Sequence, residues 1–139
     1  MFGLTKRQFL KKSKKCLRET GIQILLLREL MDKEAQESLS PLDAHRNLDN
    51  IRRNIEDTFN WYEKLNPPTK CLPLQQKIMN SLIVFHEAAV KNSESLIALE
   101  NGLEEEFKNK LRDSKEELQK FLETFQPLIN EVDLYLLRK

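Results

Sequence analysis

Apolar residues recur every three or four positions in four long stretches of the chain, and turn-forming residues separate these stretches. In the first stretch, Leu10, Leu17, Ile24 and Met31 follow one another at intervals of seven. Such a repeat, close to 3.5 residues per turn, is typical of helices that pack almost antiparallel in bundles and coiled coils. No comparable stretch alternates with a period of two, so the pattern predicts an all-α protein.

Prolines and a glycine mark where these helices begin and end. Ser40 can cap a helix whose first position is Pro41. Residues 67–68 are consecutive prolines and stop that helix, because proline has no N–H to donate. Gly102 suits the left-handed position that follows many helices. We therefore predict a single helical-bundle domain over residues 1–139, with helices over residues 5–38, 41–65, 72–100 and 103–137.

Short connections between long helices determine the predicted topology. Connections of only a few residues make successive helices run antiparallel, so we predict an up-down-up-down antiparallel four-helix bundle with long helices. At 1.5 Å per residue, such helices form a rod roughly 40–50 Å long. Two features are candidates for interrupting the last helix. Pro127 should kink it, and Asp113-Ser114 resembles a second helix start.

The third predicted helix combines a wide apolar face with one polar core position. A second apolar stripe lies beside the main one and predicts a wide buried face; it is formed by Met79, Ile83, Val90 and Ile97. Asn92 falls on the main core stripe, where a buried amide costs stability but can fix register or partner choice. Near the end of the second helix, Trp61 and Tyr62 are expected to plug the core, with partner anchoring as the alternative.

Composition narrows the class of protein further. The chain has 139 residues, about the size of one domain, and only 3 glycines and 5 prolines, too few turn residues for a many-stranded fold. Cys16 and Cys71 are isolated, which indicates neither a disulfide framework nor a zinc site. The apolar run at 22–27 is far shorter than the ~18 residues that span a bilayer. We therefore expect a cytoplasmic protein with two free thiols.

Charge is distributed unevenly along the chain. Residues 1–18 contain seven cations and no acid, a local charge of +7 in a chain whose net charge is +1, so residues 19–139 carry −6. A basic arm on a mildly acidic body predicts an anionic partner for the arm. The candidate partner-binding residues are six of these cations: Arg7, Lys11, Lys12, Lys14, Lys15 and Arg18.

We interpret this arm as the contact surface of a non-catalytic protein-interaction module, whose partner is a protein with an acidic surface. A peripheral membrane protein or non-specific nucleic-acid binder that uses the same basic face is the alternative. The cations would have no partner role if they only paired with acids of a neighbouring helix. Phe9, Leu10 and Leu17 lie on the opposite side of the helix. If they join the core they cannot enter lipid, which favours protein or nucleic-acid contact.

A homodimer through the first and last helices is a further option, because both helices carry extra apolar residues that neighbours must cover. These residues are Leu25, Leu26 and Leu30 in the first helix and Leu122, Ile129 and Leu136 in the last.

The chemistries that helical bundles usually host lack their residues here. Carboxylate-bridged metal sites need Glu-x-x-His pairs, but neither His45 nor His86 follows a glutamate at that spacing. His86 opens an H-E-x-x-H pattern whose second histidine position is occupied by Val90. Glu34 and Glu37 form only the first half of an E-x-x-E…E-x-x-D magnesium motif. We therefore expect no enzymatic activity, cofactor or metal, and we expect His86 to be a satisfied histidine in the core or at its boundary.

Overall fold

The computed structural model describes residues 3–138, and most of these residues lie in four α-helices. The helices are α1 (Lys6–Ala35), α2 (Pro41–Glu63), α3 (Leu72–Glu100) and α4 (Glu104–Leu137), and a short 3-10 helix, η1 (Thr69–Cys71), precedes α3. No strand occurs within residues 3–138. The prediction of an all-α helical bundle is confirmed, and each helix boundary lies within three residues of its predicted position.

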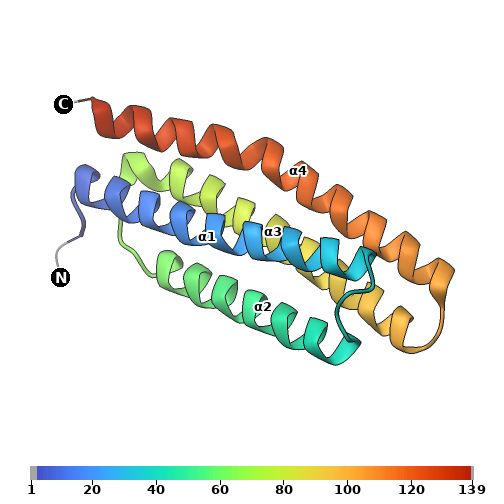
Figure 1. Cartoon of the computed structure of the whole chain (residues 1–139). Coiled ribbons are helices and arrows are strands. Elements are labelled where there is room, and N and C mark those ends of the chain that lie inside the picture. Colours follow the sequence, from blue (N-terminus) through green and yellow to red (C-terminus); the bar gives the residue numbers. More distant parts are fainter. Residues whose placement is uncertain (1–2, 139) are drawn as a thin grey trace.

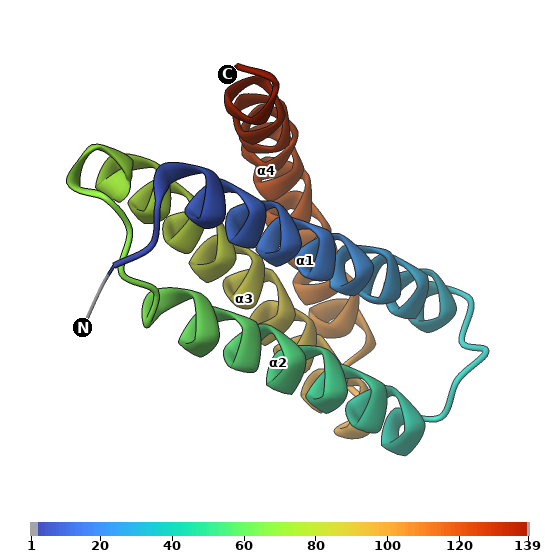
Figure 2. The same ribbon diagram turned by 90° about the vertical axis from the view of Figure 1, so that its left-hand side faces the viewer.

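Successive helices run in opposite directions, so that both chain termini lie at one end of the bundle (Figure 1). We call this the terminal end; the α1–α2 and α3–α4 connections form the opposite, loop end. α3 packs against all three other helices and most extensively against α4, whereas α2 and α4 occupy opposite corners. In the view of Figure 2, the C-terminal part of α4 stands away from α2.

Local hydrogen bonds explain where the helices begin. A capping box opens α1: the Thr5 hydroxyl accepts from the Gln8 backbone N–H, and the Gln8 side chain accepts from the Thr5 backbone N–H. As predicted, Ser40 caps α2, accepting from the backbone N–H of Asp43 at 3.2 Å. The chain before α1 is also tied down, because the Leu4 N–H donates to the Asn66 carbonyl at 2.9 Å.

Two residues with positive φ end the helices at the loop end. Gly102 has φ +72°, and its neighbours close a Schellman turn in which the Leu103 N–H donates to the Ala98 carbonyl at 3.0 Å. The same turn ends α1, where Glu37 has φ +53°. This turn stops α1 at Ala35, three residues before the predicted end at residue 38. Only one of these turns contains a glycine, Gly102, so the earlier end of α1 was not predicted.

The predicted core stripes form one buried cluster that draws on all four helices. The second apolar stripe of α3 is an exception, because Ile83 is 47% and Ile97 50% exposed. The prediction of a wide buried face on α3 is therefore wrong at these two positions. Ile83 lies at the outer margin of the contact with α2, in a groove that it lines with Phe59 and His86. Neighbouring helices thus cover the main stripe of α3 fully and its flank only in part, since Met79 and Val90 are half-buried.

α4 is one continuous helix, although two interruptions were considered for it. Ser114 does not restart the helix, because its hydroxyl is buried and donates to the Ala88 carbonyl of α3 at 2.8 Å. The hydroxyl thus joins two helices instead of capping one. Pro127 lies inside α4 without ending it, and its ring is exposed.

Candidate interaction surface on the first helix

The six predicted partner-binding cations all lie on α1, near the terminal end of the bundle. Lys12 is half-buried, and the other five are exposed. Arg7, Lys11, Lys14 and Arg18 recur at intervals of three and four, which places them on one face of the helix. We call these four residues the basic stripe. Lys12 and Lys15 lie to its sides.

Pairing with neighbouring acids involves only two of the six cations. Lys14 Nζ lies 3.1 Å from Asp133 Oδ1 on α4. Lys15 Nζ lies 3.9 Å from Glu19 Oε1 and 5.0 Å from the centre of the Trp61 ring. Within residues 3–138, the other four (Arg7, Lys11, Lys12 and Arg18) have no carboxylate within 4.0 Å. Internal pairing therefore leaves most of this positive charge available for another molecule.

The opposite side of α1 belongs to the core. Phe9, Leu10 and Leu17 are at most 4% exposed. Phe9 stacks on Tyr62 of α2, with ring centroids 5.8 Å apart. These side chains could enter a lipid layer only if α1 left the bundle, so the N-terminal half of α1 offers its partners charge and little apolar surface.

Apolar side chains continue the same exposed face farther along α1. Leu25 follows Arg18 by seven residues and is 66% exposed, and Ile22 and Leu26 are 52% and 42% exposed. Leu30, which sequence analysis grouped with Leu25 and Leu26 as dimer surface, is 3% exposed and belongs to the core. On α4, the residues proposed for the same dimer are half-buried and pack against the core: Leu122, Ile129 and Leu136.

Both histidines join neighbouring helices at the surface. His45 Nε2 lies 2.9 Å from Glu100 Oε1, and His86 Nε2 lies 3.2 Å from Glu56 Oε1. His86 is half-buried, at the boundary of the core. Among residues 3–138, no three His, Cys, Asp or Glu side chains gather closely enough to hold a metal ion. Over the same residues, no helix has the length and apolar character needed to cross a membrane.

The terminal end contains a neutral polar cluster inside the core. Ser13 Oγ and Tyr62 Oη lie 2.7 Å apart, and both residues are fully buried. Gln75 Nε2 donates to the Tyr62 carbonyl at 3.2 Å. Burial also raises the pKa of the Cys16 thiol to about 12, so its nucleophilic thiolate form is disfavoured at neutral pH.

Glu34 places a buried carboxyl nearer the loop end, although the sequence suggested this residue only as part of an incomplete magnesium motif. Glu34 is 2% exposed, and its Oε2 accepts from Asn92 Nδ2 at 2.7 Å. Its Oε1 and the side-chain Oδ1 of Asn92 are buried without hydrogen-bond partners. Burial raises the pKa of Glu34 to about 7, although the Asn92 hydrogen bond and the charge of Lys115 lower it. The sequence does contain a signal for this burial, because Glu34 follows Met31 by three residues and so falls on the core stripe of α1.

Comparison with known proteins provides no relative to guide this description. Neither models of protein families nor curated proteins nor solved structures give a match to the chain.

Proposed function

We propose that the protein is a non-catalytic, cytoplasmic interaction module, which binds an acidic protein surface through the basic stripe and Lys12 and Lys15 beside it. The observation that supports this proposal is the set of exposed, unpaired cations on one face of α1, above all Arg7, Lys11 and Arg18. Charge on a rigid helix steers an oppositely charged partner and fixes its orientation. The buried, free thiols of Cys16 and Cys71 agree with a reducing compartment.

The apolar residues along the same face favour a protein over a phosphate backbone. Ile22, Leu25 and Leu26 adjoin the basic stripe and leave an apolar surface that a nucleic-acid backbone would not cover. A protein helix with acidic residues followed by apolar ones would cover both parts. A second copy of the chain is another protein that could cover the apolar part, as in the predicted dimer.

Charge reversal tests the proposal. The stripe variant carries Arg7→Glu, Lys11→Glu and Arg18→Glu. The matched control carries Arg53→Glu, Lys108→Glu and Arg112→Glu on α2 and α4; these are exposed cations that have no carboxylate partner among residues 3–138. In a native-lysate pull-down, we expect the stripe variant to recover about tenfold less of the protein partner than the wild type does, and the control to recover as much as the wild type. Partner sets that are the same for wild type and both variants would contradict the proposal.

The alternative functions need their own measurements. Sedimentation with vesicles that contain phosphatidylserine tests the membrane function, and a gel shift with duplex DNA tests the nucleic-acid function. If either target binds the wild type in low salt and releases the stripe variant alone, that alternative replaces the protein partner. Sedimentation equilibrium of the wild type shows whether a second copy is the partner.

A further inference from the structure

A hollow of about 390 Å³ lies at the terminal end of the bundle, between the first turns of α1 and α3 and the last turns of α4. Figure 1 shows these three segments gathered at that end. Three lysines line the hollow, one each from α1, η1 and α3: Lys6, Lys70 and Lys77. We call this hollow the lysine pocket. Its volume falls within the range of ordinary ligand pockets, about 300–1,000 Å³, so a small organic molecule fits it.

The lysine pocket carries an excess of positive charge. Lys77 Nζ lies 3.5 Å from Glu131 Oε1, and Glu131 is the one acid among the residues that line the pocket. Lys6 and Lys70 have no carboxylate within 4.0 Å among residues 3–138. Three lysines and one glutamate give the lining a formal charge of +2. A ligand with two negative charges would neutralise it.

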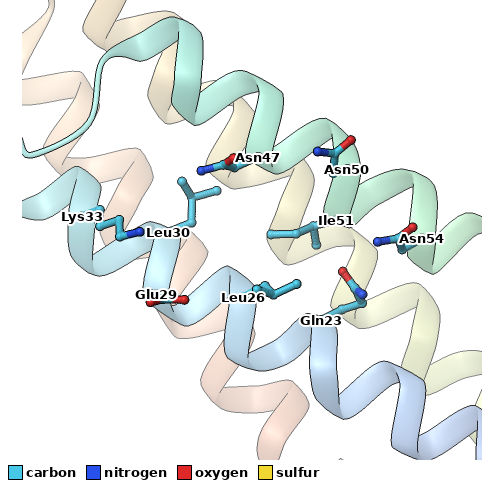
Figure 3. A pocket seen from close by; sticks show the side chains of 9 residues that line it. All are labelled: Gln23, Leu26, Glu29, Leu30, Lys33, Asn47, Asn50, Ile51 and Asn54. Carbon is cyan, nitrogen blue, oxygen red and sulfur yellow. The ribbon is translucent and has the colours of Figure 1, made fainter.

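The groove between the C-terminal half of α1 and the N-terminal half of α2 has no such excess (Figure 3). Glu29 and Lys33 are the charged residues that line it, so its formal charge is zero. The rest of its lining consists of amide and aliphatic side chains. Charge therefore selects a ligand at the lysine pocket and selects none at this groove.

The helix starts beside the lysine pocket do not offset its charge. Neither α1 nor α3 has an acid in its first turn, whereas α4 begins, at the loop end, with three glutamates. A helix start carries partial positive charge, so an acid there is favourable and a cation is not. Lys6 is the first residue of α1, and Lys70 lies two residues before α3. The lysines therefore add positive charge beside two helix starts, and a bound anion would relieve the repulsion.

The lysine pocket also has an apolar part. Pro73, which is exposed, and Tyr135, which is half-buried, both line it. Lys6 Nζ lies 5.2 Å from the centre of the Tyr135 ring, a cation–π contact that keeps the ammonium group beside the pocket. Ammonium groups next to ring surfaces suit a ligand that joins an anionic group to a small organic one.

We propose that the lysine pocket binds a small, soluble phosphomonoester, in which a phosphate group is attached to an organic group. Lys6, Lys70 and Lys77 donate to the phosphate oxygens, while the organic group contacts Pro73 and the ring of Tyr135. A phosphomonoester carries a charge of about −1.5 to −2 at pH 7 and three terminal oxygens that accept hydrogen bonds. It therefore matches the +2 charge and the three lysines, whereas a carboxylate carries a single negative charge. The pocket shares no residue with the basic stripe and does not depend on the function proposed for it.

Titration with phenyl phosphate at constant ionic strength, followed in an amide correlation NMR spectrum, tests the proposal. We expect saturable shifts for the backbone signals of Lys70, Leu74 and Tyr135, and none for Lys108 and Arg112, which are exposed near the loop end. Benzoate has the same ring but one negative charge, so it should bind at least several-fold more weakly. Non-saturable shifts, no shifts at all, or equally tight binding of benzoate would overturn the proposal.

Two triple variants test the lysines themselves. The pocket variant combines three substitutions of exposed side chains: Lys6→Gln, Lys70→Gln and Lys77→Gln. The matched control removes the same number of exposed charges elsewhere: Arg53→Gln, Lys108→Gln and Arg112→Gln. The pocket variant should bind phenyl phosphate about tenfold more weakly than the wild type, and the control should bind it as the wild type does. An equal loss in both variants would show attraction to exposed cations in general and would overturn the proposal.

Vesicles distinguish a soluble ligand from a lipid headgroup, because the headgroup of phosphatidic acid is also a phosphomonoester. The pocket variant and its matched control have the same net charge, so both should sediment to the same extent with vesicles that contain phosphatidic acid. Weaker sedimentation of the pocket variant than of the control would overturn the assignment to a soluble ligand.

Discussion

The two ends of the core bury polar side chains in different ways. At the terminal end, Ser13 and Tyr62 pair two neutral hydroxyls at 2.7 Å. Nearer the loop end, Glu34 and Asn92 form one hydrogen bond of 2.7 Å and leave an oxygen on each side without a partner. The hydroxyls of Ser13 and Tyr62 satisfy each other. In the second pair, two buried oxygens have no donor when Glu34 is ionised.

This difference shows that buried polar groups need not serve the same purpose. A neutral, satisfied pair stabilises one arrangement of helices over a wide pH range. A buried carboxyl favours that arrangement only when it is protonated, because burial disfavours its ionised form. Protonated Glu34 carries no charge and therefore avoids this penalty. The loop end is therefore the part of the bundle whose stability should depend on pH.

Glu34→Gln should change stability most, and mainly at high pH. The pKa of Glu34 is about 7 in the folded protein against 4.5 as the ordinary value, so the native state binds the proton more tightly. Stability is then highest below pH 4.5 and falls as pH rises through 7. The free-energy penalty of ionisation is on the order of 3 kcal/mol, and glutamine avoids it. Urea unfolding should show a more stable variant at pH 8.5 and similar proteins at pH 4.5.

Glu116→Gln provides the control for this measurement, since Glu116 is an exposed glutamate on α4. It should change unfolding free energy by less than about 0.5 kcal/mol at either pH, as surface substitutions usually do. A stability gain for Glu34→Gln that is equal at both pH values would show that the carboxyl does not titrate in this range.

The helices were predictable because their signals are local. The seven-residue spacing from Leu10 to Met31 and the turn residues Pro41 and Gly102 need only short stretches of sequence. The turn at Glu37 was not predicted because a glutamate rarely occupies a left-handed position. Contacts between residues that are distant in the sequence were harder to predict than the helices. The Glu34–Asn92 hydrogen bond joins residues from two helices, and whether Arg7 or Lys11 pairs with an acid depends on which helix lies beside it.

Tyr62→Phe should have a smaller effect that does not depend on pH. It removes the hydroxyl next to Ser13 and leaves the Ser13 hydroxyl buried and unpaired, which costs about 1–2 kcal/mol. Adding Ser13→Ala should recover part of this loss, because both polar groups are then absent. Urea unfolding of the two single variants and the double variant measures the coupling. Additive losses would show that the two hydroxyls do not interact.

Glu37→Gly should give the smallest effect, a gain in stability of up to about 1 kcal/mol. Glu37 holds φ at +53°, where a side chain is strained and glycine is not. The greater freedom of glycine in the unfolded chain offsets part of this gain.

Gly102→Ala is the matched control at the equivalent turn, where φ is +72° and an added Cβ would meet no atom within 4 Å. It isolates backbone strain and should destabilise the protein by about 1 kcal/mol. Thermal unfolding should therefore move the midpoint up for one variant and down for the other. A lower midpoint for Glu37→Gly would mean that the Glu37 side chain stabilises the turn by more than its backbone strain costs.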